Sequence, residues 1–165
     1  MGGVNVGGGM NPDHQEHPEA HSSPAVPRIV VGIDGSESSL QALGRAARQA
    51  ELTGAALEAV MTWDLPVTYD WFPQILADWD PQADVTKSLH EIVEQERRAH
   101  PDVTVHPRVV QGHPAPILIE ASRGAELLVL GCRGHGEFAG MLLGSTSAHC
   151  VSQAHCPVLI VRGDS

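Results

Sequence analysis

The sequence predicts an α/β domain built on a five-stranded, parallel, doubly wound sheet with the strand order 3-2-1-4-5. Short apolar runs rich in Val, Ile and Leu alternate along the 165-residue chain with longer segments whose apolar residues recur at helical spacing. The short runs lack polar alternation, which is typical of strands buried on both faces. Hydrophobic residues make up 42% of the chain and aromatic residues only 4%, so the predicted core is aliphatic.

The first predicted strand is 28–33 (RIVVGI), which ends in an Asp-Gly-Ser turn. From Ser38 onward apolar residues follow helical spacing, and Gly54 is expected to end that helix. The second predicted strand is 56–63. The segment 63–79 contains five of the six aromatic residues and two prolines, and it is predicted to be a long loop.

A charged helix is predicted over about 81–100, because its apolar residues recur in helical register. Val103, Val105 and Val109 mark a third strand. Pro107 lies within this strand, and it should bend the strand or confine it to an edge of the sheet.

A short helix is predicted at 114–122, with two prolines in its first turn and Gly124 as the residue that ends it. A fourth strand follows at 126–131. The last two predicted elements are a helix at 145–154 and a strand at 157–162. Strands separated by helical crossovers predict a parallel sheet with helices on both faces.

The first 27 residues differ from the rest of the chain. They hold five Gly, four Pro, three His and three acidic residues, with no Lys or Arg. This composition predicts a disordered tail over 1–27 and a single folded domain over 28–165. Weak metal binding by His14, His17 and His21 is the functional alternative for the tail.

The charge of the chain excludes several classes of partner. The net charge is -10 and Lys87 is the single lysine, so nucleic acid and anionic membranes are not expected partners. No Walker A motif is present, because Lys87 does not follow a glycine. No stretch suits a membrane span or an export signal, so the cytoplasm is the expected compartment.

The three cysteines, an odd number, do not suggest a disulfide framework. Two His-Cys pairs, at 149–150 and 155–156, make zinc binding an alternative to packing. No CxxC sequence supports it, so packing is the favoured interpretation.

In a doubly wound sheet, ligands bind beyond the carboxyl ends of the strands where the strand order reverses. Here that point falls between the first and fourth strands. Two unusual loops leave these strands, 32–36 and the glycine-rich 131–146. The sequence therefore predicts a ligand site between these two loops.

The second loop has the composition of a phosphate cradle. Its glycines let backbone N–H groups approach an anion, and Ser145 and Thr146 begin a helix whose N-terminus attracts negative charge. Arg133 and His135 are the cationic side chains available. The alternative is that the glycines only shape a turn and Ser145 only caps a helix.

Asp34 also has two interpretations. Its carboxylate is positioned to cap the helix that follows it. Alternatively, its hard oxygen atoms hold a magnesium ion against phosphates, which its place opposite the glycine-rich loop favours.

Three motifs resemble the universal stress protein family, over about 28–165. The first is VVGIDGSESS at 30–39, and the last is AHCPVLIVR at 154–162. Between them stands the nucleotide motif G-x2-G-x9-G-[ST], at Gly131, Gly134, Gly144 and Ser145.

The resemblance implies a Rossmann-like fold that binds ATP and forms a homodimer through the last strand. Thr62 would lie by the adenine, and Asp34 would also serve Mg²⁺. The residues that the resemblance assigns to the nucleotide are Gly32, Asp34, Thr62, Gly131, Cys132, Arg133, Gly134, His135, Gly136, Glu137, Gly144, Ser145 and Thr146.

Three positions depart from the family pattern. Cys132 stands where a small hydroxyl residue is more usual, and His135 replaces a position that is often Arg. Glu137 stands where a small residue is common, and an acid beside a triphosphate is unfavourable unless it turns outward or a metal bridges it.

We therefore expect an ATP-binding stress protein whose nucleotide state signals to a partner protein. No residue of the loop is an obvious activated base, so we expect at most slow ATP hydrolysis rather than an efficient enzyme. The alternatives are a nucleotide-free dimeric interaction module, a nucleotide-hydrolysing or adenylyl-transferring enzyme, and a cyclic AMP binder.

Two further regions are candidates for contacts with a partner. The apolar run 158–161 predicts an uncovered sheet edge, which favours dimerisation over coverage by the chain's own helices. For the aromatic segment, three roles stay open: Trp71, Phe72 and Trp79 form a lid over the nucleotide, an exposed patch for a partner, or a packing layer on the next helix.

Overall fold

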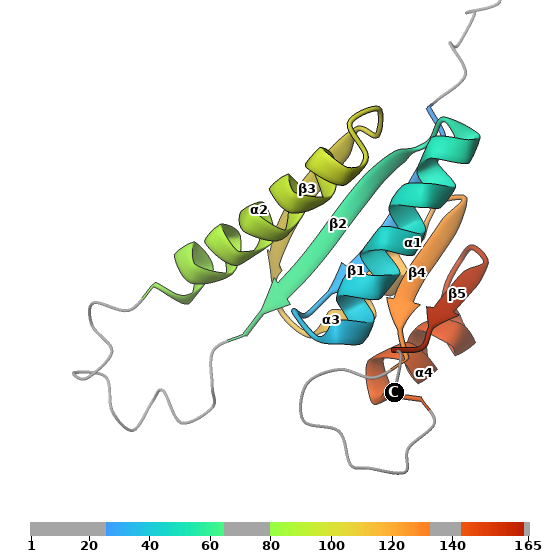
Figure 1. Ribbon diagram of the computed structural model, residues 1–165. Helices are drawn as coiled ribbons and strands as arrows, with labels where there is room; N and C mark the ends of the chain where they lie inside the picture. Colours follow the sequence, from blue (N-terminus) through green and yellow to red (C-terminus); the bar gives the residue numbers. More distant parts are fainter. Residues whose placement is uncertain (1–25, 65–79, 133–142, 164–165) are drawn as a thin grey trace, which may run out of the picture.

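The computed structural model describes residues 26–64, 80–132 and 143–163 (Figure 1). Within these ranges strands and helices alternate from β1 to β5. Their bounds are β1 Arg28–Ile33, α1 Glu37–Thr53, β2 Ala56–Trp63, α2 Pro81–Ala99, β3 Val105–Gln111, α3 Pro114–Ala121, β4 Leu127–Gly131, α4 Ser145–Gln153 and β5 Val158–Val161.

The strands form one five-stranded sheet in the order β3-β2-β1-β4-β5, and every neighbouring pair is parallel. This confirms the predicted fold class and strand order. Parallel neighbours need crossovers, and the four described helices supply them. The carboxyl ends of all strands consequently meet at one edge of the sheet.

The sheet is buried on both faces because its central strands carry apolar side chains in both directions. Along β1, Ile29 and Val31 pack with α1, whereas Val30 packs with α3 on the opposite face. The α1 side of the sheet also carries α2, and the other side carries α3 and α4 (Figure 1). The continuous apolar runs in the sequence thus reflect double-sided burial.

Most predicted boundaries agree with the structure to within two residues. The second strand matches at both ends, and Gly54 ends α1 with φ 69°. The third strand begins at Val105 rather than Val103, because Val103 lies in a turn in which its N–H donates to the carbonyl of His100. Pro107 lies on an edge strand, as predicted.

The end of α3 is a small correction. The helix ends at Ala121 with Ser122 as its cap, and Gly124 adopts φ 68° two residues later. β5 forms the second edge of the sheet, and Leu159 is its exposed large apolar side chain. Val158 and Ile160 pack on the α4 side, so only part of this strand is uncovered.

Several predictions lie outside the described residues. They are the disorder of the tail up to residue 25, metal binding by its three histidines, and the role of Trp71, Phe72 and Trp79. Among the described residues, no helix is both long and apolar enough to cross a membrane.

Candidate functional site

A pocket of about 320 Å³ opens at the carboxyl edge of the sheet, where β1 and β4 lie side by side. Elements far apart in the sequence contribute to it: the ends of β1, β2 and β4, and the first turns of α3 and α4. The predicted site residues that line this pocket are Gly32, Asp34, Thr62, Gly131, Gly144, Ser145 and Thr146. The predicted location between the two loops is therefore a real concavity.

Cys132 is a predicted site residue that the structure does not bring to the pocket lining. Its side chain is buried, and its backbone makes two hydrogen bonds just after the end of β4. The N–H of Cys132 donates to the carbonyl of Val161 at 2.8 Å, and its own carbonyl accepts from the N–H of Gly144 at 2.7 Å. Cys132 thus joins the ends of β4 and β5 to the start of α4.

The remaining predicted site residues follow Cys132 in the sequence. They are Arg133, Gly134, His135, Gly136 and Glu137, and all of them are outside the described residues.

The N-terminus of α1 is closed by its own residues. Ser36 is the N-cap, and its side chain accepts a hydrogen bond from the N–H of Ser39. The N–H and the hydroxyl of Ser36 both donate to Oδ1 of Asp34, at 2.9 and 2.5 Å. The interpretation in which Asp34 caps the helix is therefore wrong. Asp34 instead accepts hydrogen bonds from Ser36, which is the cap residue.

The N-terminus of α4 is built differently. Its N-cap is Gly144, which has no side chain to accept from the first turn. Ser145 is the first helical residue, so the alternative in which Ser145 caps the helix is wrong. The Ser147 hydroxyl donates to the carbonyl of Gly131 at 2.7 Å, which anchors α4 to the end of β4. A helix start without a side-chain cap offers its N–H groups and partial positive charge to an anion.

The inner wall of the pocket is aliphatic. Val60, Leu118 and Leu130 line it together with Pro114. A Cβ atom at Gly32 would lie 2.7 Å from Cδ2 of Leu130 and 3.1 Å from Cδ1 of Leu118, so only glycine lets these leucines reach this depth.

Sequence reasoning missed the aliphatic wall and two serines. The missed lining residues are Ile33, Ser39, Val60, Pro114, Leu118, Leu130 and Ser147. One signal could have found part of this set. The connection after β3 starts at the carboxyl edge of the sheet, so the first turn of α3 was expected to lie at the same edge as the site.

Gly131 is a glycine for a packing reason as well. A Cβ atom there would lie 2.5 Å from Oγ of Ser38 and 2.9 Å from the backbone of Ser38 and Ser39. The first turn of α1 therefore rests directly on the end of β4. This close contact brings the two loops of the site together.

The described lining carries one charged side chain, Asp34. Among the described residues, no three His, Cys, Asp or Glu side chains come together to hold a metal. A divalent cation at this site would rest on the Asp34 carboxylate and on oxygen atoms of the ligand, a donor set that suits Mg²⁺.

The cysteines of the last helix region pack in the core. Cys150 is fully buried, and burial raises the pKa of its thiol to about 11. Cys156 packs against the same cluster. Nδ1 of His149 lies 2.9 Å from the carbonyl oxygen of Ser145. These placements agree with the packing interpretation of the His-Cys pairs.

Comparisons with known proteins match almost the whole described chain. The sequence profile of the universal stress protein family matches residues 26–162. A universal stress protein of Mycolicibacterium smegmatis is 36% identical over 150 residues, which cover 90% of this chain and 49% of that protein. Universal stress protein Rv1996 of Mycobacterium tuberculosis is 36% identical, with 89% and 47% coverage. The chain thus spans about half the length of these relatives.

Solved structures resemble the fold. A universal stress protein in complex with cAMP is 31% identical, with a TM-score of 0.64 over 84% of this chain and 98% of that one. UspA from Lactobacillus plantarum is 22% identical, with a TM-score of 0.70 over 82% of this chain and 97% of that one. At that identity, the second likeness shows the fold alone.

Proposed function

Because the chain belongs to the universal stress protein family, we propose that its carboxyl-edge pocket binds an adenine nucleotide and that the bound state signals to a partner protein. The observation that carries the proposal is the pocket itself. It joins an aliphatic wall to a helix start without a side-chain cap, and nucleotides combine a flat base, whose ring faces pack on apolar surfaces, with anionic phosphate.

The base and the phosphate would each contact a different part of the pocket. The base would pack against Val60, Leu118 and Leu130, with the Thr62 hydroxyl at its polar edge. Phosphate would lie at the first turn of α4, where backbone N–H groups and the helix dipole favour negative charge. Asp34 would hold Mg²⁺, and the ion would neutralise phosphate charge near that carboxylate.

We expect signalling rather than rapid catalysis. The described lining offers Asp34 as its one carboxylate, and the proposal already assigns that carboxylate to Mg²⁺. A carboxylate that coordinates a metal ion is a poor general base for water attack, because the ion lowers its basicity. We therefore propose at most slow ATP hydrolysis, which a phosphate-release assay with saturating Mg-ATP would measure.

Cyclic AMP is a second candidate ligand. One solved relative at 31% identity is a complex with cAMP. The described lining also has no cationic side chain, and a singly charged phosphodiester needs less positive charge than a triphosphate does. Competition between Mg-ATP and cAMP for the same pocket would rank the two.

Calorimetric titration with Mg-ATP, cAMP and adenosine tests the proposal. We expect saturable binding of at least one nucleotide, and the absence of any saturable heat at millimolar concentrations would overturn it. In Ser145→Glu, a carboxylate at the start of α4 suits the helix dipole but repels phosphate. Nucleotide affinity should fall about tenfold while adenosine still binds. Ser152→Glu places the same charge on an exposed position of α4 and should leave affinity unchanged.

We also propose that the protein acts in the cytoplasm and dimerises through the β5 edge. Leu159 is 41% exposed there, and uncovered edges invite pairing with another chain. Light scattering should report a dimer, and Leu159→Lys should shift it toward monomer. A wild-type chain that stays monomeric at high concentration would contradict this part of the proposal.

A further inference from the structure

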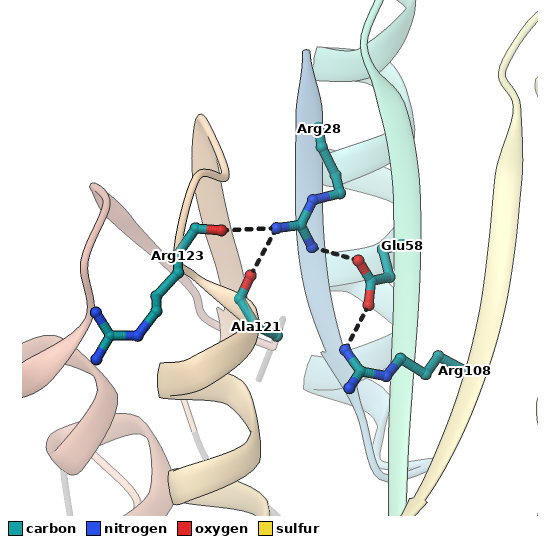
Figure 2. Close-up of polar contacts among 5 residues, drawn as sticks. All are labelled: Arg28, Glu58, Arg108, Ala121 and Arg123. Carbon is teal, nitrogen blue, oxygen red and sulfur yellow. Dashed lines mark hydrogen bonds and ion pairs between the residues drawn. The ribbon is translucent and has the colours of Figure 1, made fainter. Parts of the chain in front are cut away.

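Arg28, the first residue of β1, joins three elements on the sheet face that carries α3 (Figure 2). Its Nη1 group contacts the Glu58 carboxylate on β2. Its Nη2 group donates to the carbonyl of Ala121 at 3.0 Å and to that of Arg123 at 2.9 Å. These four residues, Arg28, Glu58, Ala121 and Arg123, are called the α3 clasp below. The clasp fixes the C-terminal end of α3 to β1 and β2.

The Glu58 carboxylate orders the guanidinium of the clasp. Its side chain is only 13% exposed, and its second oxygen accepts from Nη1 of Arg108 on β3 at 2.9 Å. Burial raises the pKa of Glu58, but the hydrogen bonds from Arg108 and Arg28 outweigh it, so the pKa lies below its ordinary value. Glu58 therefore stays ionised at neutral pH and holds Arg28 in one orientation. Figure 2 shows the carboxylate between the two arginines.

The helix that the clasp holds is a wall of the pocket. α3 is short, with 8 residues, and its first turn contributes Pro114 and its middle contributes Leu118 to the lining. Its start has no side-chain cap hydrogen bond. Its other end carries the polar contacts of the clasp, and there the hydroxyl of Ser122 also accepts a hydrogen bond from the N–H of His155 at 2.8 Å.

The position of α3 sets the depth of the pocket because Leu118 approaches the backbone of β1 at Gly32. An ideal Cβ at that glycine would lie only 3.1 Å from Leu118, so Leu118 has no room to move closer to β1. A shift of α3 along the sheet would move Leu118 and Pro114 relative to Val60 on β2. Such a shift would change the wall against which a base packs.

We propose that Arg28 is a positioning residue for the base-binding half of the pocket, acting through the α3 clasp. This inference rests on the proposed nucleotide function. Arg28 precedes Gly32 by four strand residues, which corresponds to about 13 Å, so it acts at a distance rather than by contact with the ligand. The planar guanidinium of Arg28 donates to three acceptors at once, and the single ammonium group of a lysine would be less suited to that geometry.

The test is Arg28→Met, which keeps an apolar stem of similar length and removes all three polar contacts. We expect the Kd values for adenosine and for Mg-ATP to rise by the same factor, roughly 2- to 30-fold, because the wall contacts the base and not the phosphate. Arg28→Lys, which keeps the charge, should give a smaller change in the same direction. The matched control is Arg98→Met, because Arg98 is an exposed arginine on α2 that neither belongs to the clasp nor lines the pocket. Its affinities should equal those of the wild type.

Amide hydrogen exchange supplies a second measurement that needs no ligand. In both Arg28 variants the amides of α3 should exchange faster, while those of α1 and β4 stay protected. Wild-type affinity together with wild-type exchange in α3 would overturn the inference, and so would a loss confined to Mg-ATP. If the wild-type chain binds neither adenosine nor Mg-ATP, the proposed function fails, whereas the exchange measurement still decides whether the clasp positions α3.

Discussion

Two helix N-termini, those of α1 and α4, begin at the same pocket and are built in opposite ways. α1 carries a serine cap, fixed in turn by the Asp34 carboxylate. α4 begins at Gly144, which supplies no side-chain oxygen, and the N–H of Gly144 is used by Cys132. The first helix therefore receives a side-chain acceptor from its own cap residue, whereas the cap residue of the second supplies none.

The difference indicates which end of the pocket suits an anion. Both helices present the positive end of a dipole, but at α1 a carboxylate and a hydroxyl already occupy the place of a ligand. A helix start whose cap is a glycine is stabilised less from within, and phosphate can supply the missing acceptor. The pocket thus has one helix start with a side-chain cap, at α1, and one with a glycine cap, at α4, where we propose that phosphate binds.

Gly131→Ala should have the largest effect, because its side chain would push the first turn of α1 away from the end of β4. The new Cβ would lie 2.5 Å from Oγ of Ser38 and 2.9 Å from backbone atoms, which cannot move independently of α1. We expect the free energy of unfolding to fall by about 1–3 kcal/mol in urea denaturation. Gly44→Ala is the control, since its Cβ would meet only Glu96 at 3.8 Å within a helix, and it should stabilise by up to about 1 kcal/mol. A neutral Gly131→Ala would show that α1 does not rest on β4 as described.

The dependence of stability on pH tests whether the Glu58 carboxylate holds the pocket wall in place through Arg28. The pKa of Glu58 is lower in the folded state than its ordinary value, so its ionised form stabilises the fold above about pH 4.3 and that contribution is lost as pH falls through the folded-state pKa. Glu58→Gln should cost about 1–2 kcal/mol at pH 7 and flatten the acid limb of the stability curve.

Glu94→Gln is the control for acid, because Glu94 is 53% exposed in its pair with Arg97. Such surface pairs contribute little, so its curve should follow that of the wild type. Identical acid limbs for wild type and Glu58→Gln would contradict the role of Glu58.

Ser36→Ala removes the side-chain cap of α1, so the start of this helix then lacks a side-chain cap, as the start of α4 does. The N–H of Ser39 then loses its side-chain acceptor and keeps the carbonyl of Ser36, and Asp34 loses the hydroxyl donor, so we expect a loss of about 1 kcal/mol in unfolding free energy. Adenosine affinity should hardly change, because the base half of the pocket is untouched. Ser36→Gly, which imitates the start of α4, should cost only a few tenths of a kcal/mol relative to wild type. Equal stability of all three proteins would show that α1 does not depend on its cap.

Gly144→Ser is the reverse exchange and the smallest expected effect on stability. Gly144 has φ -69° and ψ 159°, which any residue adopts, so a serine there can cap α4 as Ser36 caps α1. Stability should rise by about a few tenths of a kcal/mol, while Mg-ATP affinity falls about 2- to 10-fold because the hydroxyl competes with phosphate. Stronger nucleotide binding in this variant would contradict the proposal that phosphate binds at the start of α4.

The fold was predictable because local signals and topology agree. Apolar runs marked the strands, and the reversal of strand order predicted that the pocket lies between β1 and β4. Gly32, Asp34 and the start of α4 were predicted correctly as neighbours on this ground, whereas Thr62, which also lines the pocket, was expected from the family resemblance alone. Such predictions succeed because the carboxyl ends of parallel strands have to meet.

The aliphatic wall and the inward turn of Cys132 were not predictable from local pattern. Leu118 and Val60 look like ordinary core residues in the sequence, and only the tertiary arrangement turns them toward the pocket. The roles of Asp34 and Ser36 depend on one turn of backbone, in which either residue has the chemistry of a cap. Arg28 gave no signal, because its three acceptors come from residues 30 to 95 positions away.

The most direct test of the central claim is an amide NMR titration of the wild-type chain with Mg-ATP. We predict that the largest shifts fall on the N–H groups of Ser145, Thr146 and Ser147, at the glycine-capped start of α4. The N–H groups of Ser38 and Ser39, at the serine-capped start of α1, should shift much less. Saturable binding with its largest shifts at the start of α1, or no saturable shift at either helix, would contradict the account.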